Sequence, residues 1–215
     1  MKKNLVILSL LALLPVISIA GEKGGTLNVG ADVVSSYIWR GVKFGNGAAF
    51  QPVLEYSLGG FTAGAWGSYG FADGEFSEAD LYASYGFKSG LSLGLTKYYF
   101  PGTSFFEANA HAWELNGGFE KGVFSFSANY ILNEGAESAG GDIYLEAGIT
   151  TGPVNWFIGA GDGWHNPGGK FNVCNIGLTG TREIRLTDSF VLPVFSTIVL
   201  NPRMEQFHIV FGITL

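Results

Sequence analysis

Six acidic side chains fall on the polar face of the alternating segments of this chain, and they are its most informative chemical groups. They are Asp32, Glu55, Asp80, Glu114, Asp142 and Glu146. Arg40 lies on the same face, whereas most other basic residues lie in predicted turns or loops, so these acids cannot all pair internally. An unpaired buried carboxylate is costly. The pattern therefore favours a water-filled interior whose acidic wall attracts cations.

A structural interpretation of the same residues remains open. Carboxylates inside a barrel can bond to tyrosine, serine or arginine merely to hold its shape, and here they could bind the Arg40 side chain. Trp66 and Phe157, both expected to face inward, would narrow a channel of intermediate width. On the channel interpretation the pore-lining residues are Asp32, Arg40, Glu55, Trp66, Asp80, Tyr82, Glu114, Asp142 and Glu146.

Residues that could form a catalytic site are sparse. Asp162 and His165 are the best candidate pair, but glycines surround both, and a solvated loop histidine is the simpler interpretation. A hydrolase also needs a nucleophile within reach of its base. The three histidines lack metal-ligand spacing, and Cys174 has no disulfide partner. We expect no enzyme, no metal and no cofactor, and we expect Cys174 to face outward.

An export signal precedes the elements that carry these residues. Two early lysines, an apolar run over 5–17 and small residues at Ser18 and Ala20 predict a signal peptide over 1–20. A retained membrane anchor is the weaker alternative, because the run is short for a span. Residues 21–215 then form one domain. The full chain carries a net charge of −6, and removing two lysines makes it more acidic, which argues against nucleic-acid binding.

The mature chain alternates apolar and polar residues, which is the period of a strand. It is 47% hydrophobic but has no later apolar run of the ~20 residues that a membrane helix needs. Segments of about ten residues match tilted strands that cross a bilayer. About twelve strands are predicted, over 26–42, 49–58, 61–71, 78–87, 91–100, 108–119, 123–132, 142–150, 154–162, 172–181, 189–200 and 205–215.

The connections between these segments are alternately short and long. Glycine-rich turns near 59–60, 88–90, 120–122 and 151–153 alternate with longer polar links, as in outer-membrane barrels, although the link at 182–188 is long for its side. An even strand number places both termini on the periplasmic side. The last segment alternates up to Leu215, which resembles the C-terminal signal that barrel-assembly machinery reads, although that signal often ends in Phe.

Aromatic residues near the predicted strand ends suit two girdles at the membrane interfaces. One set falls near periplasmic ends and comprises Phe61, Phe87, Phe119 and Trp156. The other falls near outer ends and comprises Tyr37, Trp39, Tyr69, Phe71, Tyr99 and Tyr130. A soluble all-β protein would also alternate, but twelve such strands would leave large apolar patches in water.

Several short motifs occur in an order that resembles one bacterial family. The segment 35–41, Ser-Ser-Tyr-Ile-Trp-Arg-Gly, resembles the early motif of the TorF-type porins, also called the Gcw family of exported proteins. Further segments that resemble this family lie at 51–57, 63–66, 78–82, 98–102 and 141–146. The resemblance implies an outer-membrane barrel and a pore, and it brings no catalytic residues.

The sequence thus predicts an all-β, transmembrane, antiparallel up-and-down barrel in the outer membrane of a Gram-negative-type bacterium. The expected function is passive diffusion of small hydrophilic solutes or ions through a narrow acidic lumen. A closed structural or adhesive barrel that displays its loops is the first alternative, and a lipid-modifying enzyme is the second. The expected partners are outer-membrane lipid, the assembly machinery and small solutes.

Overall fold

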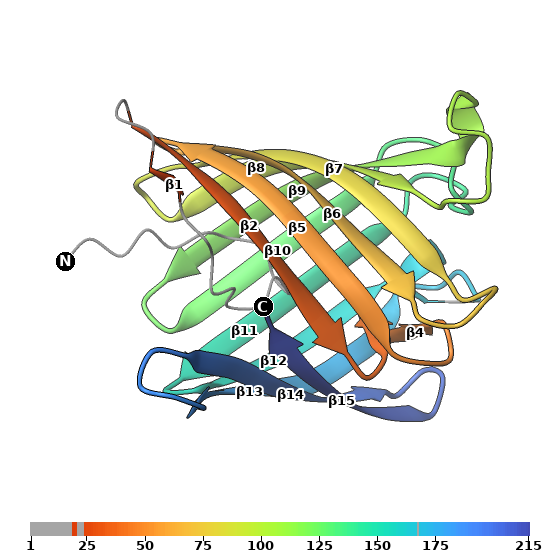
Figure 1. Cartoon of the computed structure of the whole chain (residues 1–215). Coiled ribbons are helices and arrows are strands. Elements are labelled where there is room, and N and C mark those ends of the chain that lie inside the picture. Colours follow the sequence, from red (N-terminus) through yellow and green to blue (C-terminus); the bar gives the residue numbers. More distant parts are fainter. Residues whose placement is uncertain (1–18, 21–23, 167) are drawn as a thin grey trace.

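Twelve antiparallel strands close into one barrel in the computed structural model, which describes residues 19–20, 24–166 and 168–215 (Figure 1). Residues 1–18 of the predicted signal peptide lie outside the described residues. The barrel strands are β2 (Gly25–Val34), β5 (Ala49–Leu58), β6 (Phe61–Gly70), β7 (Ser77–Gly86), β8 (Leu91–Tyr99), β9 (His111–Lys121), β10 (Phe124–Ile131), β11 (Ile143–Thr151), β12 (Val154–Gly161), β13 (Asn172–Arg185), β14 (Val191–Asn201) and β15 (Gln206–Thr214).

Closure joins the first barrel strand to the last. β2 pairs with β5 on one edge and with β15 on the other, and every remaining barrel strand pairs with its neighbours in sequence. A short strand β1 (Ile19–Ala20) also pairs with β2. The predicted fold of about twelve antiparallel strands is confirmed, and eleven of the twelve predicted segments match a strand closely.

The two ends of the barrel differ in their connections. We call the end with connections at 59–60, 87–90, 122–123, 152–153 and 186–190 the turn end, and it lies on the left in Figure 1. The opposite end, the loop end, carries the longer connections, with the 3₁₀ turns η1 (Ala108–Ala110) and η2 (Gly163–His165). No helix among the described residues is long and apolar enough to cross a membrane.

Alternation along each strand separates an apolar outside from a mixed inside. Side chains such as Leu54, Leu95, Phe126 and Ile158 are exposed on the outer wall. Alternate residues point inward, because successive side chains of a strand lie on opposite faces. The predicted aromatic positions near the turn end, Phe61, Phe87, Phe119 and Trp156, are all exposed on the outside.

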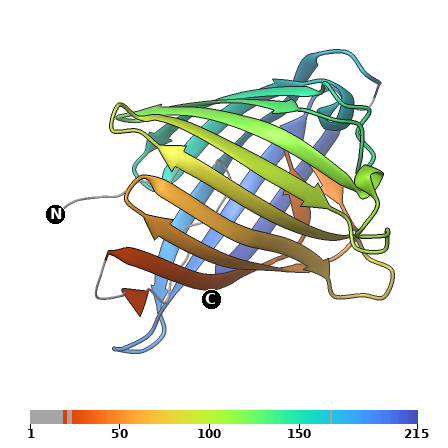
Figure 2. The same ribbon diagram turned by 90° about the horizontal axis from the view of Figure 1, so that it is seen from above.

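The first predicted strand was wrong beyond residue 34. β2 ends at Val34, and the chain then forms a small hairpin of β3 (Tyr37–Trp39) and β4 (Val42–Phe44) inside the loop end (Figures 1 and 2). We call residues 37–44 the inner hairpin. Tyr37 and Trp39 therefore do not join an outer girdle. The chain leaves the wall at Ser35, whose hydroxyl accepts a hydrogen bond from the Phe211 amide.

Cys174 does not face outward as predicted. It is fully buried in β13, beside a register shift where β12 and β13 pair irregularly. Its carbonyl oxygen lies against Gly41, where an added Cβ atom would collide with it. This contact lets the turn of the inner hairpin approach the wall closely, and it explains why residue 41 has no side chain.

Candidate functional site

Arg40 sits at the tip of the inner hairpin and makes the central contact inside the barrel. Its guanidinium donates two hydrogen bonds to the carboxylate of Glu114 on β9, at 2.6 and 3.0 Å. The same group lies between two aromatic rings, 4.5 Å from the centre of Trp39 and 4.4 Å from that of Tyr144. A planar guanidinium suits both the two-pronged carboxylate contact and the stacking.

The backbone at the hairpin tip supports this contact. Arg40 and Gly41 both have positive φ, of 50° and 84°. Positive φ at both central residues is typical of a two-residue hairpin turn that matches the twist of its strands. Asn201 on β14 donates a hydrogen bond of 3.0 Å to the Gly41 carbonyl. The tip is thus fixed to β9 on one side and to β13 and β14 on the other.

His165, a residue of the loop between β12 and β13, packs against the guanidinium of Arg40. His165 in η2 is fully buried, and its Nε2 atom lies 3.3 Å from Nη1 of Arg40. Burial, and then the charge of Arg40, lower the pKa of His165 well below its ordinary value. The prediction of a solvated loop histidine was therefore wrong. Asp162 does not join it, because the Asp162 carboxylate accepts a hydrogen bond from the Ile143 amide instead.

Four of the interior glutamates each accept a hydrogen bond from a tyrosine hydroxyl. The pairs are Tyr37 with Glu78 at 3.0 Å, Tyr82 with Glu55 at 2.9 Å, Tyr98 with Glu114 at 2.9 Å and Tyr144 with Glu146 at 2.5 Å. All four pairs are buried. This network matches the structural interpretation of the acids, in which they hold the barrel in shape.

Aromatic rings fill the space around the hairpin at the loop end. Trp39 makes edge contacts with Tyr98 and Trp164, with ring centres 5.6 and 5.7 Å apart. Phe76 and Phe100 extend the cluster, and Trp164 reaches Phe100. Edge-to-face contacts of this kind add to the burial of the rings themselves. The inner hairpin is therefore packed as part of a solid plug.

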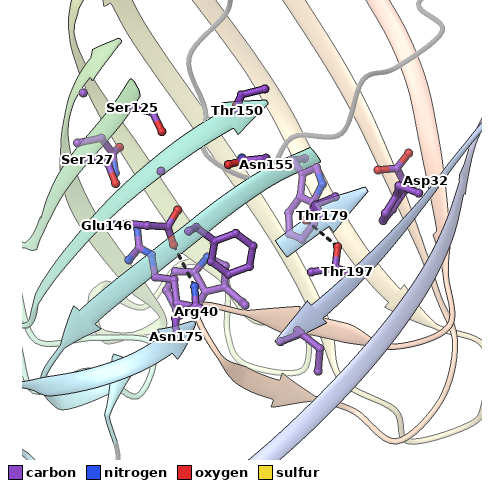
Figure 3. Close-up of a pocket in the computed structure, with 18 of the residues that line it drawn as sticks. Asp32, Arg40, Ser125, Ser127, Glu146, Thr150, Asn155, Asn175, Thr179 and Thr197 are labelled. Carbon is purple, nitrogen blue, oxygen red and sulfur yellow. Dashed lines mark hydrogen bonds between the residues drawn. The ribbon is translucent and has the colours of Figure 1, made fainter. Parts of the chain in front are cut away.

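One cavity of about 860 Å³ occupies the rest of the interior (Figure 3). Its lining begins at the inner hairpin and reaches Gly122, Gly152 and Pro153 in the connections of the turn end. Among the described residues, none from the loops at 71–76, 100–110, 132–142 and 162–171 lines it. In the described part of the chain, the cavity is thus a well that the plug closes at the loop end and that extends to the connections of the turn end.

The wall of the well differs from side to side. Small polar side chains cover the strands from β10 to β13, including Ser125, Ser127, Asn155 and Thr179 (Figure 3). Apolar side chains from β14, β15 and β2 line another side, among them Phe195, Val210 and Val34. Acidic residues are the most numerous charged groups, with seven acids and two arginines in the lining.

The structure brings most of the predicted pore-lining residues to this well. Asp32, Arg40, Trp66, Asp80, Tyr82, Glu114 and Glu146 contribute to its lining. Glu55 faces inward, but it is covered by its bond to Tyr82 and does not line the cavity. Asp142 was placed wrongly, since it lies at the loop end and accepts bonds from Ser138 and the Trp164 amide.

Sequence reasoning missed three further acids of the lining, Glu78, Glu120 and Glu183. The signal for Glu78 was available, because it lies two residues before Asp80 and must share its face of the strand. The role of His165 had no such signal, since a loop position does not reveal what the loop packs against. The described residues contain no group of three or more His, Cys, Asp or Glu side chains that could hold a metal ion.

These features define a closed, twelve-stranded β-barrel with a plug formed by its own chain. The chain belongs to the Gcw_chp family, described as "Bacterial protein of unknown function", whose model matches residues 20–172. The match covers the motif at 35–41, so the inner hairpin lies within the family region. No curated protein matches the chain.

Proposed function

We propose that this barrel resides in the outer membrane and acts as a gated, narrow porin for small hydrophilic solutes or ions. The observation that carries the proposal is the well with acidic groups in its wall, which extends from the connections of the turn end to the inner hairpin. A wall with seven acids and two arginines favours water and cations over an apolar filling. This proposal agrees with the resemblance to the TorF-type porins.

The outer wall supports the membrane location. Exposed leucine, isoleucine, phenylalanine and tryptophan side chains occur on nearly all barrel strands. An apolar surface of that extent is unfavourable in water and suits contact with lipid. The sheet closes where Asp32–Val34 of β2 pair with Gly212–Thr214 of β15, and a closed sheet is what a barrel in lipid needs. We place the turn end and both termini in the periplasm, and we expect the C-terminal strand to be recognised by the assembly machinery.

The inner hairpin acts as the gate in this proposal. It closes the loop end through Arg40, Glu114 and the aromatic cluster, so a solute crosses only when the hairpin leaves that position. The hairpin is attached to the wall through short links at 35–36 and 45–48. Its displacement would leave every barrel strand in its register and would open the well to the outside.

Conductance of the refolded mature protein in planar bilayers tests this proposal. We expect the wild type to show rare, cation-selective openings, and a variant lacking residues 37–44 to show frequent and larger ones. Heat-modifiable gel mobility verifies that both barrels fold. A folded deletion variant that conducts no better than the wild type would overturn the gated porin.

A closed barrel that displays its loops is the second candidate, and the solid plug favours it. Trp164 in η2 and Phe100 belong to the aromatic cluster, so parts of two outer loops are anchored in the plug. Anchored loops present a defined surface, which suits a binding role. If this candidate is correct, removing exposed parts of 101–107 or 168–171 abolishes adhesion to a partner and leaves conductance unchanged.

A further inference from the structure

We infer that the part of the well next to the inner hairpin is a binding site for a small organic cation, which is held between Glu78, Asp80 and the ring of Trp66. This inference rests on the proposed function, because it names the class of solute that the well accepts. The ligand class is a primary ammonium or guanidinium compound with a short apolar group.

The two carboxylates are neighbours on one wall. Glu78 and Asp80 are two residues apart on β7, both face the well, and they lie within hydrogen-bonding reach of each other. Both are more than nine-tenths buried. Two carboxylates this close cannot both be charged without a counter-charge, so one proton or one cation must lie between them.

Neither arginine of the lining forms an ion pair with these two carboxylates. Arg40 is engaged by both oxygens of Glu114. Arg182 is exposed in the turn-end part of β13, far along the wall from the hairpin. No described basic side chain forms a salt bridge with Glu78 or Asp80.

The hydrogen bonds that the rest of the protein makes to the pair are incomplete. Glu78 accepts one bond from the Tyr37 hydroxyl, at 3.0 Å. The Oδ1 atom of Asp80 is buried and has no hydrogen-bond partner. A buried acceptor without a donor costs about 1–3 kcal/mol, and an ammonium or guanidinium group would supply the missing donors.

Aromatic and apolar groups complete the site. Trp66 is the register partner of Asp80 on β6, and Tyr37 contacts Trp66 with ring centres 5.6 Å apart and ring planes tilted by 55°. Aromatic faces attract cations, most strongly when water is excluded. The apolar strands β14 and β15 are five and four places from β7 around the barrel, so an apolar group of the ligand would face them across the well.

Without a bound cation, one proton shared by the two carboxyl groups lowers the charge of the pair from −2 to −1. Binding of a monocation then expels that proton to solvent, and the total charge at the site does not change. No bond other than this O–H bond is broken. The proton release gives the proposal a test in the wild-type protein.

Calorimetry of the refolded mature barrel in detergent micelles measures this directly. The probes are butylammonium and ethylguanidinium chloride, with 1-butanol as the uncharged analogue and potassium chloride as the inorganic cation. We expect saturable binding of the organic cations alone, with a heat that changes with the ionisation enthalpy of the buffer as one proton is released. Equal heats for butanol and butylammonium, or tighter binding of potassium, would overturn the inference.

Variants then locate the site. We expect Asp80→Asn and Glu78→Gln each to weaken butylammonium binding at least tenfold. Glu120→Gln, which removes an acid of the same lining nearer the turn end, should change it less than twofold. If only one of Asp80→Asn and Glu78→Gln folds, the affinity of that folded variant for butylammonium is the test of the site. Unchanged affinity in a folded variant refutes the site. Binding in micelles does not depend on conduction, so a closed barrel that still binds the cation refutes the porin alone.

Discussion

Replacing Arg40 with methionine is the sharpest test of the plug, because it removes one half of a buried ion pair. The Arg40 side chain is 10% exposed and that of Glu114 is 0% exposed, so the remaining carboxylate would be a buried charge without its counter-charge. Removing one partner of such a pair costs about 3–5 kcal/mol. Trp39 and Tyr144 also lose the cation between them, which adds to the loss.

The protein can avoid the cost of the unpaired carboxylate if the inner hairpin leaves its closed position at the loop end. The effect of Arg40→Met is therefore measured as a change in channel opening. A change of about 3 kcal/mol shifts an equilibrium by roughly a hundredfold, so a hairpin that rarely opens would open often. We expect the open probability in planar bilayers to rise by that order in Arg40→Met. Unfolding in urea, followed by tryptophan fluorescence, should show a lower midpoint if the hairpin stays docked.

Two matched variants test whether the unpaired charge of Glu114 is what opens the plug. Arg40→Met combined with Glu114→Gln removes both charges and should recover most of the closed state, because replacing a whole buried pair costs little. Arg182→Met removes an exposed arginine of the same lining and should leave the open probability and the urea midpoint at their wild-type values. A folded Arg40→Met protein with wild-type conductance and an unchanged urea midpoint would refute the ion pair as the latch.

Two more predictions concern the groups around the hairpin tip. Gly41→Ala should open the plug and lower stability, because its Cβ atom would collide with the Cys174 carbonyl. The control is Gly122→Ala, because Gly122 also has positive φ but has open space around it. This control should lower the free energy of unfolding in urea by only about 1 kcal/mol. Lowering the pH from 7.5 to 5 should increase the open probability in bilayers, and His165→Asn should abolish that pH dependence. His165 has a lowered pKa when docked, so the undocked state binds more protons below about 6.5, and docking weakens as the pH falls. Equal open probabilities at both pH values in the wild type would contradict this.

Most of the barrel could be predicted because its signals are local. A strand such as β15 alternates through Phe207, Ile209 and Phe211, and that alternation alone defines both its type and its outer face. Turns at 59–60 and 152–153 are set by glycines within the turn itself. Each of these features depends on residues a few positions apart, so one sequence contains the information.

The inner hairpin could not be predicted in this way, because its pattern imitates a strand. Tyr37 and Trp39 continue the odd-numbered apolar positions of β2, so alternation gives no sign that the chain has left the wall. The nearest local signals are Ser35 and the Arg40-Gly41 turn. What fixes the hairpin is Glu114, which lies 74 positions from Arg40 in the sequence.

Partners that are distant in the sequence also explain why the roles of the interior acids could be predicted only in part. Their inward direction follows from strand parity, but their state depends on partners from other strands. Glu114 is neutralised by Arg40 and held by Tyr98, whereas Asp80 keeps a buried oxygen without a donor. Two carboxylates with the same sequence signal therefore have opposite consequences, since one locks the plug and the other leaves a site for a cation. A variant that opens the plug at Arg40 also moves Tyr37 away from Glu78, but Asp80 and Trp66 stay on the wall, so it should retain cation binding at Asp80. Loss of cation binding in that variant would mean that the hairpin itself forms part of the cation site.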